Sequence, residues 1–354
     1  MQPRNHVPLV EVTRGHIVES IHYGSIAIAQ PNGEIIFSLG DMDNPYYLRS
    51  SAKPFQTLAF LEAGGIREYD LTLQEIAIIC ASHSGTDEHV QVLEALQAKI
   101  GIQESMLQCG IHTPYDPETA RNKLMKGEPF HSNQHDCSGK HTGMLAFAKM
   151  IGAPTDNYLD PQHPVQQAML RTFAEMCGVE IDTIQLGTDG CSAPVFAVPL
   201  PNSAAAYARL SQPDTLGEKR ATACDKITTA MMAHPFMVGG PQRFDTDIMS
   251  AAGGSLVTKI GAEGFHGVAV MPGHSGVFPS GLGIAVKIAD GDLSLRAGSV
   301  AVIQVLKTLK VLCSEELRDL ADYDRRPLYN WREKEIGEIR PSPELLEALE
   351  NLRA

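Results

Sequence analysis

Hydrophobic and polar positions divide the chain into three parts with different periodicity. Alternating or continuous apolar runs rich in β-branched residues predict strands over 7–15, 20–30, 34–40, 264–272 and 281–291. Asn32-Gly33, between two of these runs, predicts a hairpin. Apolar residues at three- and four-residue spacing predict helices over 88–101, 163–178, 203–212 and 225–235.

This order of elements predicts an α/β domain built from both chain ends. We expect residues 1–50 and 253–354 to form it, with a mainly helical domain, 51–252, inserted between them. A buried helix over 297–313 and a last helix that begins after Ser342 complete the C-terminal part, since Ser-Pro-Glu is typical of a helix start. We expect the active site in the cleft between the domains.

Composition narrows the classes of partner. The chain has 354 residues and a formal net charge of −13, with acidic and basic residues interspersed. A nucleic-acid or anionic-membrane surface requires a basic patch, so neither partner is expected. No apolar run approaches the roughly 18 residues of a membrane helix, and the first residues lack a signal-peptide core. The sequence therefore predicts a cytoplasmic protein.

Ser50 and Lys53 form an S-x-x-K pattern in the stretch RSSAKP. Helical spacing places the two side chains one turn apart on one face. A neutral lysine there can take the proton of a serine hydroxyl, but the same pattern fits a solvated pair at a helix start.

Two further segments carry polar side chains at the end of apolar runs. Ser82, His83 and Ser84 follow the run 76–81, a place typical of functional side chains. The alternative is that this segment only caps a helix, with Ser84 or Thr86 as the cap of the helix that starts near Asp87. Lys259 ends a short strand and stands next to Gly261, where a backbone can approach a ligand closely. The order of these motifs is similar to that in penicillin-binding proteins and serine β-lactamases: a serine with a lysine, then a second serine, then a lysine near a glycine. Ile260, however, lacks the hydroxyl of their third motif.

Cysteines occur at two of the polar loops. Cys137 lies three residues before Lys140, and Asp189 and Cys191 flank Gly190. Zinc sites usually show two close pairs of Cys or His, so this spacing alone predicts no metal site.

Seven separated motifs together resemble the asparaginases of the Rhizobium etli type. They are VEVTRGHIVES, RSSAKP, CASHSGTDEHV, CSGKHTGMLA, DGCSAPVFAVPL, RFDTDIM and KIGAEG, and they span about Pro8 to about Asp290 in order. The resemblance implies a fold similar to serine β-lactamases and glutaminases, with an antiparallel sheet, flanking helices and the inserted helical domain. It also implies hydrolysis of the side-chain amide of L-asparagine to L-aspartate and ammonia.

Carried over residue by residue, the resemblance implies two catalytic Ser-Lys pairs, Ser50 with Lys53 and Ser82 with Lys259. Either serine can be the nucleophile. Two nearby amines would each disfavour the charged form of the other.

The resemblance also implies a zinc ion held by a set of four side chains, Cys137, Lys140, Asp189 and Cys191. Two thiolates and a carboxylate weaken zinc as a Lewis acid, so a positioning role is expected rather than hydroxide generation. We assign Arg49, His83 and Asp189 to substrate binding. The guanidinium of Arg49 suits the substrate carboxylate, because arginine can bind a carboxylate in a bidentate manner.

Two other functions stay open. A penicillin-recognising serine acyl hydrolase or esterase would use the same Ser-x-x-Lys, and a non-catalytic asparagine-binding protein would keep the fold without turnover. A homodimer is the expected assembly.

Overall fold

The computed structural model describes residues 4–352 and divides into two compact units, each built from separate segments of the chain. The first unit contains the residues up to Ser51, Val198–Thr215 and the residues from Ala251 onward. The second contains Ala52–Ala197 and Leu216–Ser250. Segment 198–215, which sequence patterning places in the inserted domain, thus belongs to the unit formed by the chain ends.

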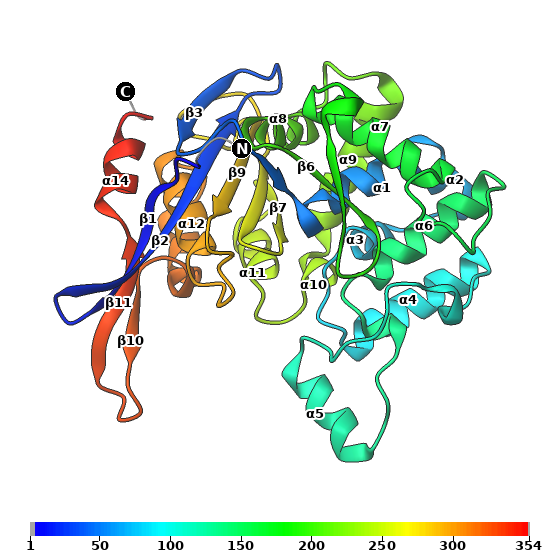
Figure 1. Cartoon of the computed structure of the whole chain (residues 1–354), viewed down its shortest axis with the longest axis horizontal. Coiled ribbons are helices and arrows are strands. Elements are labelled where there is room, and N and C mark those ends of the chain that lie inside the picture. The colour runs from blue at the N-terminus through cyan, green and yellow to red at the C-terminus, as the bar shows by residue number, and fades with distance from the viewer. Residues whose placement is uncertain (1–3, 353–354) are drawn as a thin grey trace. The chain divides into compact units, whose positions relative to one another are not determined.

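An antiparallel sheet of eight strands forms the centre of the first unit (Figure 1). Its order is β10-β11-β1-β2-β9-β8-β7, and β3 pairs with β2. The strands are β1 (Val7–Arg14), β2 (Ile17–Ala29), β3 (Ile35–Leu39), β7 (Leu256–Gly261), β8 (Phe265–Val270), β9 (Leu282–Ile288), β10 (Arg326–Tyr329) and β11 (Glu335–Pro341). This confirms the mixed α/β fold with an antiparallel sheet from both chain ends. The Asn32-Gly33 hairpin is confirmed by the pairing of β2 with β3.

Helices cover both faces of the sheet. On β8, a side chain at Gly267 would meet the Tyr207 ring of α8 (Leu200–Ser211), whereas the adjacent His266 lies against Gly298 of α12 (Gly298–Thr308). Successive residues of a strand point to opposite faces, so α8 and α12 lie on opposite sides. Burial from both sides explains why every residue of β7, β8 and β9 is buried.

The second unit is mainly helical. Its helices are α1 (Lys53–Glu62), α2 (Gly65–Tyr69), α3 (Leu73–Ile79), α4 (Asp87–Ile100), α5 (Pro117–Lys126), α6 (Ser138–Met150), α7 (Pro164–Cys177), α9 (Glu218–Ala233), α10 (Pro235–Val238) and, up to Ser250, α11 (Phe244–Ala251). A short hairpin pairs β5 (Gln185–Thr188) with β6 (Pro194–Pro199). The helices expected over 88–101, 163–178, 203–212 and 225–235 are confirmed as α4, α7, α8 and α9.

The two helices that carry the polar motifs of the second unit pack closely together. A Cβ atom at Gly139 of α6 would lie 1.9 Å from the carbonyl oxygen of Ile78 in α3. Only glycine allows this approach, which places the end of α3 beside the start of α6. Ser82 follows α3, and Cys137 immediately precedes α6.

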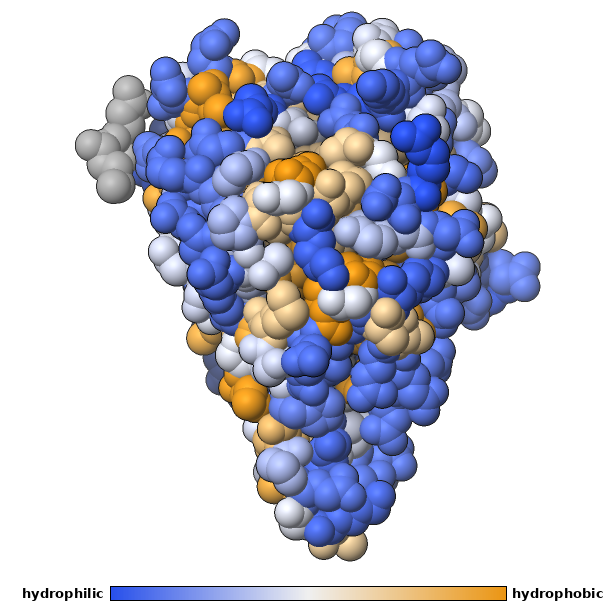
Figure 2. All heavy atoms as spheres, turned by 90° about the vertical axis from the view of Figure 1, so that its right-hand side faces the viewer, coloured by the Kyte–Doolittle hydropathy of each residue, from blue (hydrophilic) through white to orange (hydrophobic). Residues whose placement is uncertain are grey.

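The face drawn in Figure 2 is mostly hydrophilic, with apolar side chains gathered toward its centre. None of the helices within residues 4–352 is long and apolar enough to cross a membrane.

Candidate active site

Lys53 and Ser82 form a buried pair in the second unit. Lys53 is the first residue of α1, and Ser82 is fixed after α3 by a hydrogen bond from its backbone N–H to the Val238 carbonyl. Lys53 Nζ lies 2.8 Å from Ser82 Oγ and 2.5 Å from the Ala81 carbonyl oxygen. The two side chains are 1% and 6% exposed, so water does not screen their interaction. The hydrogen bond thus joins Lys53 to Ser82, whereas spacing along the chain pairs it with Ser50.

The other predicted Ser-Lys residues belong to the first unit. Arg49 and Ser50 lie in a 3₁₀ turn, Arg49–Ala52, and Arg49 has a positive φ of 53°. Backbone strain of this kind in a residue other than glycine is frequent at functional sites. Lys259 is completely buried in β7 and donates to the Ile260 carbonyl at 2.8 Å. Pairing of Ser82 with Lys259 stays a prediction.

Ser51 holds the strand that carries Lys259. Its hydroxyl donates to the Lys259 carbonyl oxygen at 2.6 Å, and a Cβ atom at Gly261 would lie 2.2 Å from the Leu48 carbonyl. Gly261, two residues after Lys259, therefore makes room for the backbone that leads to the Ser50 turn.

Asp136 provides the carboxylate nearest to Lys53. Its Oδ2 lies 3.9 Å from Lys53 Nζ, and its carbonyl oxygen lies 3.4 Å away. Burial would raise the pKa of Asp136, but Lys53, His112 and His135 together hold it well below its usual range. Asp136 is not among the residues predicted from the sequence, although its position directly before Cys137 in a polar loop was an available signal.

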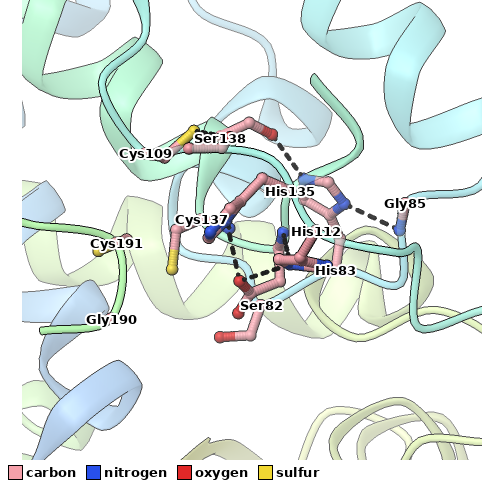
Figure 3. A network of polar contacts seen from close by, with 12 residues as sticks. Ser82, His83, Gly85, Cys109, His112, His135, Cys137, Ser138, Gly190 and Cys191 are labelled. Atoms are coloured by element: carbon pink, nitrogen blue, oxygen red, sulfur yellow. Dashed lines mark hydrogen bonds and ion pairs between the residues drawn. The ribbon is translucent and has the colours of Figure 1, made fainter. Parts of the chain in front are cut away.

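His83 is completely buried, and both of its ring nitrogens are used within the protein (Figure 3). Nδ1 accepts from the Gly85 N–H at 3.1 Å, so Nε2 carries the proton and donates to Ser138 Oγ at 2.9 Å. Burial, followed by the neighbouring His89, lowers the pKa of His83 well below the usual value. His83 is therefore neutral and ties the Ser82 segment to the start of α6.

The expected zinc ligands come from α6 and from the turn between β5 and β6. Lys140 Nζ lies 3.0 Å from Cys191 Sγ, and Cys137 and Cys191 are buried free thiols on neighbouring segments in Figure 3. Asp189 accepts from the Gly190 N–H at 2.8 Å.

The negative charges of this set favour a cation, a place that the Lys140 ammonium takes in this structure. A hydrogen bond from Cys137, together with the Lys140 ammonium, lowers the pKa of Cys191. Burial opposes the charge of Lys140, but Cys191, Cys137 and Asp189 together raise its pKa. Two sulfurs, an amine and a carboxylate also match the donor atoms that zinc accepts, provided that the lysine gives up its proton.

Comparison with known proteins now gives the family. A family model described as L-asparaginase II matches residues 10–341. The chain belongs to the L-asparaginase II family. The match includes β11, well beyond the last motif that carries the sequence resemblance, and it confirms that resemblance at the level of the family. The Rhizobium etli type is a finer prediction.

The chain is also similar to solved structures at low sequence identity. The chain is similar to the Bacillus subtilis glutaminase YbgJ in a covalent complex with 5-oxo-L-norleucine, with 13% identity, coverage of 82% of this chain and 88% of that one, and a TM-score of 0.42. It is also similar to Mglu in its native form, with 15% identity, coverage of 83% and 63%, and a TM-score of 0.42. No curated protein gave a significant match. Membership of the family supports an amidohydrolase.

Proposed function

We propose that the chain is an L-asparaginase, which hydrolyses the side-chain amide of L-asparagine to L-aspartate and ammonia. The buried hydrogen bond between Lys53 Nζ and Ser82 Oγ carries this proposal. Amide hydrolysis requires a nucleophile with a proton acceptor within hydrogen-bond reach, and this pair supplies both. Membership of the L-asparaginase II family supports the same reaction.

Ser82 is the proposed nucleophile and Lys53 its base. In this proposal Lys53 accepts the hydroxyl proton over 2.8 Å as Ser82 Oγ attacks the amide carbon, a step that requires the unprotonated amine. The C–N bond of the amide then breaks, and the Lys53 ammonium returns the proton to the leaving nitrogen, which departs as ammonia. Water attacks the acyl-enzyme, Lys53 takes the proton of that water and returns it to Ser82 Oγ, and L-aspartate is released. Ser50 and Lys259 are the other two proposed catalytic residues, Ser50 as an alternative partner of Lys53 and Lys259 as a second partner of Ser82.

The substrate carries an α-carboxylate and an α-ammonium, and each needs an opposite charge. Arg49 is the proposed partner of the carboxylate. Asp189 is also proposed to bind the substrate. His83 is fully buried with both nitrogens occupied, so we propose that it supports the Ser82 segment instead of touching substrate.

Zinc is part of the proposal as a structural group. Cys137, Lys140, Asp189 and Cys191 would hold it, and the bound ion would supply positive charge that orients a polar substrate. The steps above depend on the side chains of the chain alone.

The proposal is tested by ammonia release from L-asparagine, L-glutamine and β-aspartyl substrates, with hydrolysis of a chromogenic β-lactam in parallel. We expect L-asparagine to be the best substrate by kcat/KM. Absence of ammonia release from L-asparagine would contradict the proposal. Turnover of the β-lactam alone would favour the acyl hydrolase, and heat stabilisation by asparagine without ammonia release would favour the binding protein.

A further inference from the structure

Three side chains outside the expected zinc set meet beside the Lys53–Ser82 pair. His112 lies in the loop before α5, and His135 and Asp136 lie just before α6. One ligand atom from each residue lies within 4.8 Å of the other two. Figure 3 shows both imidazoles in the polar network around Ser82. All three residues belong to the second unit, so the arrangement does not depend on the first.

The distances match those between ligands on one ion. Asp136 Oδ1 lies 3.3 Å from His112 Nε2 and 3.1 Å from His135 Nδ1. Zinc binds nitrogen and oxygen at about 2.0–2.1 Å in tetrahedral geometry, which places neighbouring ligand atoms about 3.3 Å apart. Two edges of such a tetrahedron are therefore already formed around Oδ1.

The hydrogen bonds around the two imidazoles indicate lone pairs on the nitrogens that face Asp136. His112 Nε2 accepts from the Asp136 N–H at 3.1 Å, and His135 Nδ1 accepts from the Cys137 N–H at 3.0 Å. Contact between an imidazole nitrogen and a carboxylate oxygen at this range requires a positive charge between them, either a proton on the ring or a bound metal ion that replaces it.

The surroundings also suit a metal ligand. His112 Nδ1 donates to the Thr113 carbonyl at 2.6 Å, which leaves Nε2 as the nitrogen that can bind a metal ion. The side chains of His112, His135 and Asp136 are 26%, 9% and 14% exposed, so the ligands are held by packing and still open to an entering ion. The two oxygens of the Asp136 carboxylate face different partners. Oδ1 lies toward the two imidazoles, and Oδ2 lies toward Lys53.

We propose that His112, His135 and Asp136 form a binding site for a divalent transition-metal ion of the zinc type. Two imidazoles and one carboxylate are ligands that such ions prefer, and they leave a position for water or another small ligand. The site is separate from the set that contains Cys137 and Cys191, since it uses no sulfur.

The difference in donor atoms makes the two sites distinguishable with cobalt. Untagged full-length protein is stripped with a chelator and titrated with Co²⁺, and bound Zn²⁺ is then counted by elemental analysis after exchange. We expect a d–d absorption from the proposed site that lacks a sulfur-to-cobalt charge-transfer band. Any such band reports on the cysteines, and Cys191→Ser should remove it while leaving the His-His-Asp equivalent bound.

Three variants decide the assignment. His112→Ala should lose one equivalent of metal or weaken its binding by at least ~10-fold, and Asp136→Asn, which keeps the side-chain shape, should do the same. His131→Ala is the matched control, because His131 pairs with Glu104 at 2.8 Å in another histidine–carboxylate contact outside the site. Circular dichroism confirms that each variant is folded.

Equal stoichiometry and affinity in wild type, His112→Ala and Asp136→Asn would overturn the proposal and leave the cluster as a set of protonated contacts. Absence of any sulfur-free metal equivalent in the wild type would overturn it as well. Ammonia release from L-asparagine is measured separately, so the metal site and the proposed activity can fail independently.

Discussion

The proposed chemistry depends on Lys53, a buried lysine whose Nζ lies 2.8 Å from Ser82 Oγ. Replacing Lys53 by Met keeps the length of the side chain and removes the amine. We expect Lys53→Met and Ser82→Ala each to reduce kcat for L-asparagine by at least ~10²-fold, since both remove the proton transfer that activates the nucleophile. Steady-state ammonia release measures this loss.

The matched control is Lys149→Met, the same substitution at an exposed lysine of α6 that donates to two backbone carbonyls. It should retain the wild-type kcat. If Ser50→Ala lost activity while Ser82→Ala kept it, Ser50 would be the nucleophile and the Lys53–Ser82 contact would be structural. Thermal unfolding of each variant separates loss of chemistry from loss of fold.

At the scale of elements, the close packing of α6 on α3 positions both polar loops of the second unit. The Gly139→Ala substitution would bring a methyl group to within 1.9 Å of the Ile78 carbonyl, and neither backbone can move without shifting its helix. We expect a loss of about 1–3 kcal/mol in the free energy of unfolding, together with lower activity. Urea denaturation measures the loss.

Gly217→Ala is the control for the effect of replacing a glycine by alanine on chain entropy. A Cβ atom at Gly217, the cap of α9, meets nothing within 4 Å. Its stability should stay within about 0.5 kcal/mol of the wild type, as for surface substitutions in general. Equal effects at both positions would show that the α3–α6 contact does not need glycine.

The elements with a strong periodic pattern were predictable, and the short or irregular ones were not. The helices α4, α7 and α9 each span at least 14 residues, long enough for their apolar spacing to be recognised. In contrast, α3 has only seven residues, and its continuous apolar run fits a strand as well as a helix. The strands β10 and β11 mix charged with apolar residues and are defined mainly by their pairing with each other and with β1.

The residues of the candidate site were also predictable only where a local sequence pattern marks them. Ser82, Lys53 and the two loop cysteines stood out because each lies in a local polar motif. The contact between Lys53 and Ser82 joins positions 29 residues apart, and His112 meets Asp136 across 24 residues. Such partners depend on how α1, α3 and α6 pack, which spacing along the chain does not encode.

At the scale of the whole molecule, buried neutral histidines link stability to pH. Burial lowers the pKa of His83 and His141 well below the usual value, and it lowers the pKa of His89 to about 4. In His89, Nδ1 accepts from Thr86 and Nε2 donates to the Phe236 carbonyl at 2.9 Å. A second proton on Nδ1 would face the Thr86 N–H, so the folded state resists protonation.

This arrangement predicts a loss of stability in acid. A histidine with a depressed pKa binds its proton more readily in the unfolded chain, so its contribution is complete above pH 6.5 and falls as the pH decreases toward 4. For His89 alone the full loss is about 3 kcal/mol. The free energy of unfolding, measured in urea at intervals from pH 7 to pH 4, should fall with a steeper slope in the wild type than in His89→Gln, which cannot take up the proton. Parallel slopes would mean that His89 does not couple folding to pH, whatever the stability of the variant at neutral pH.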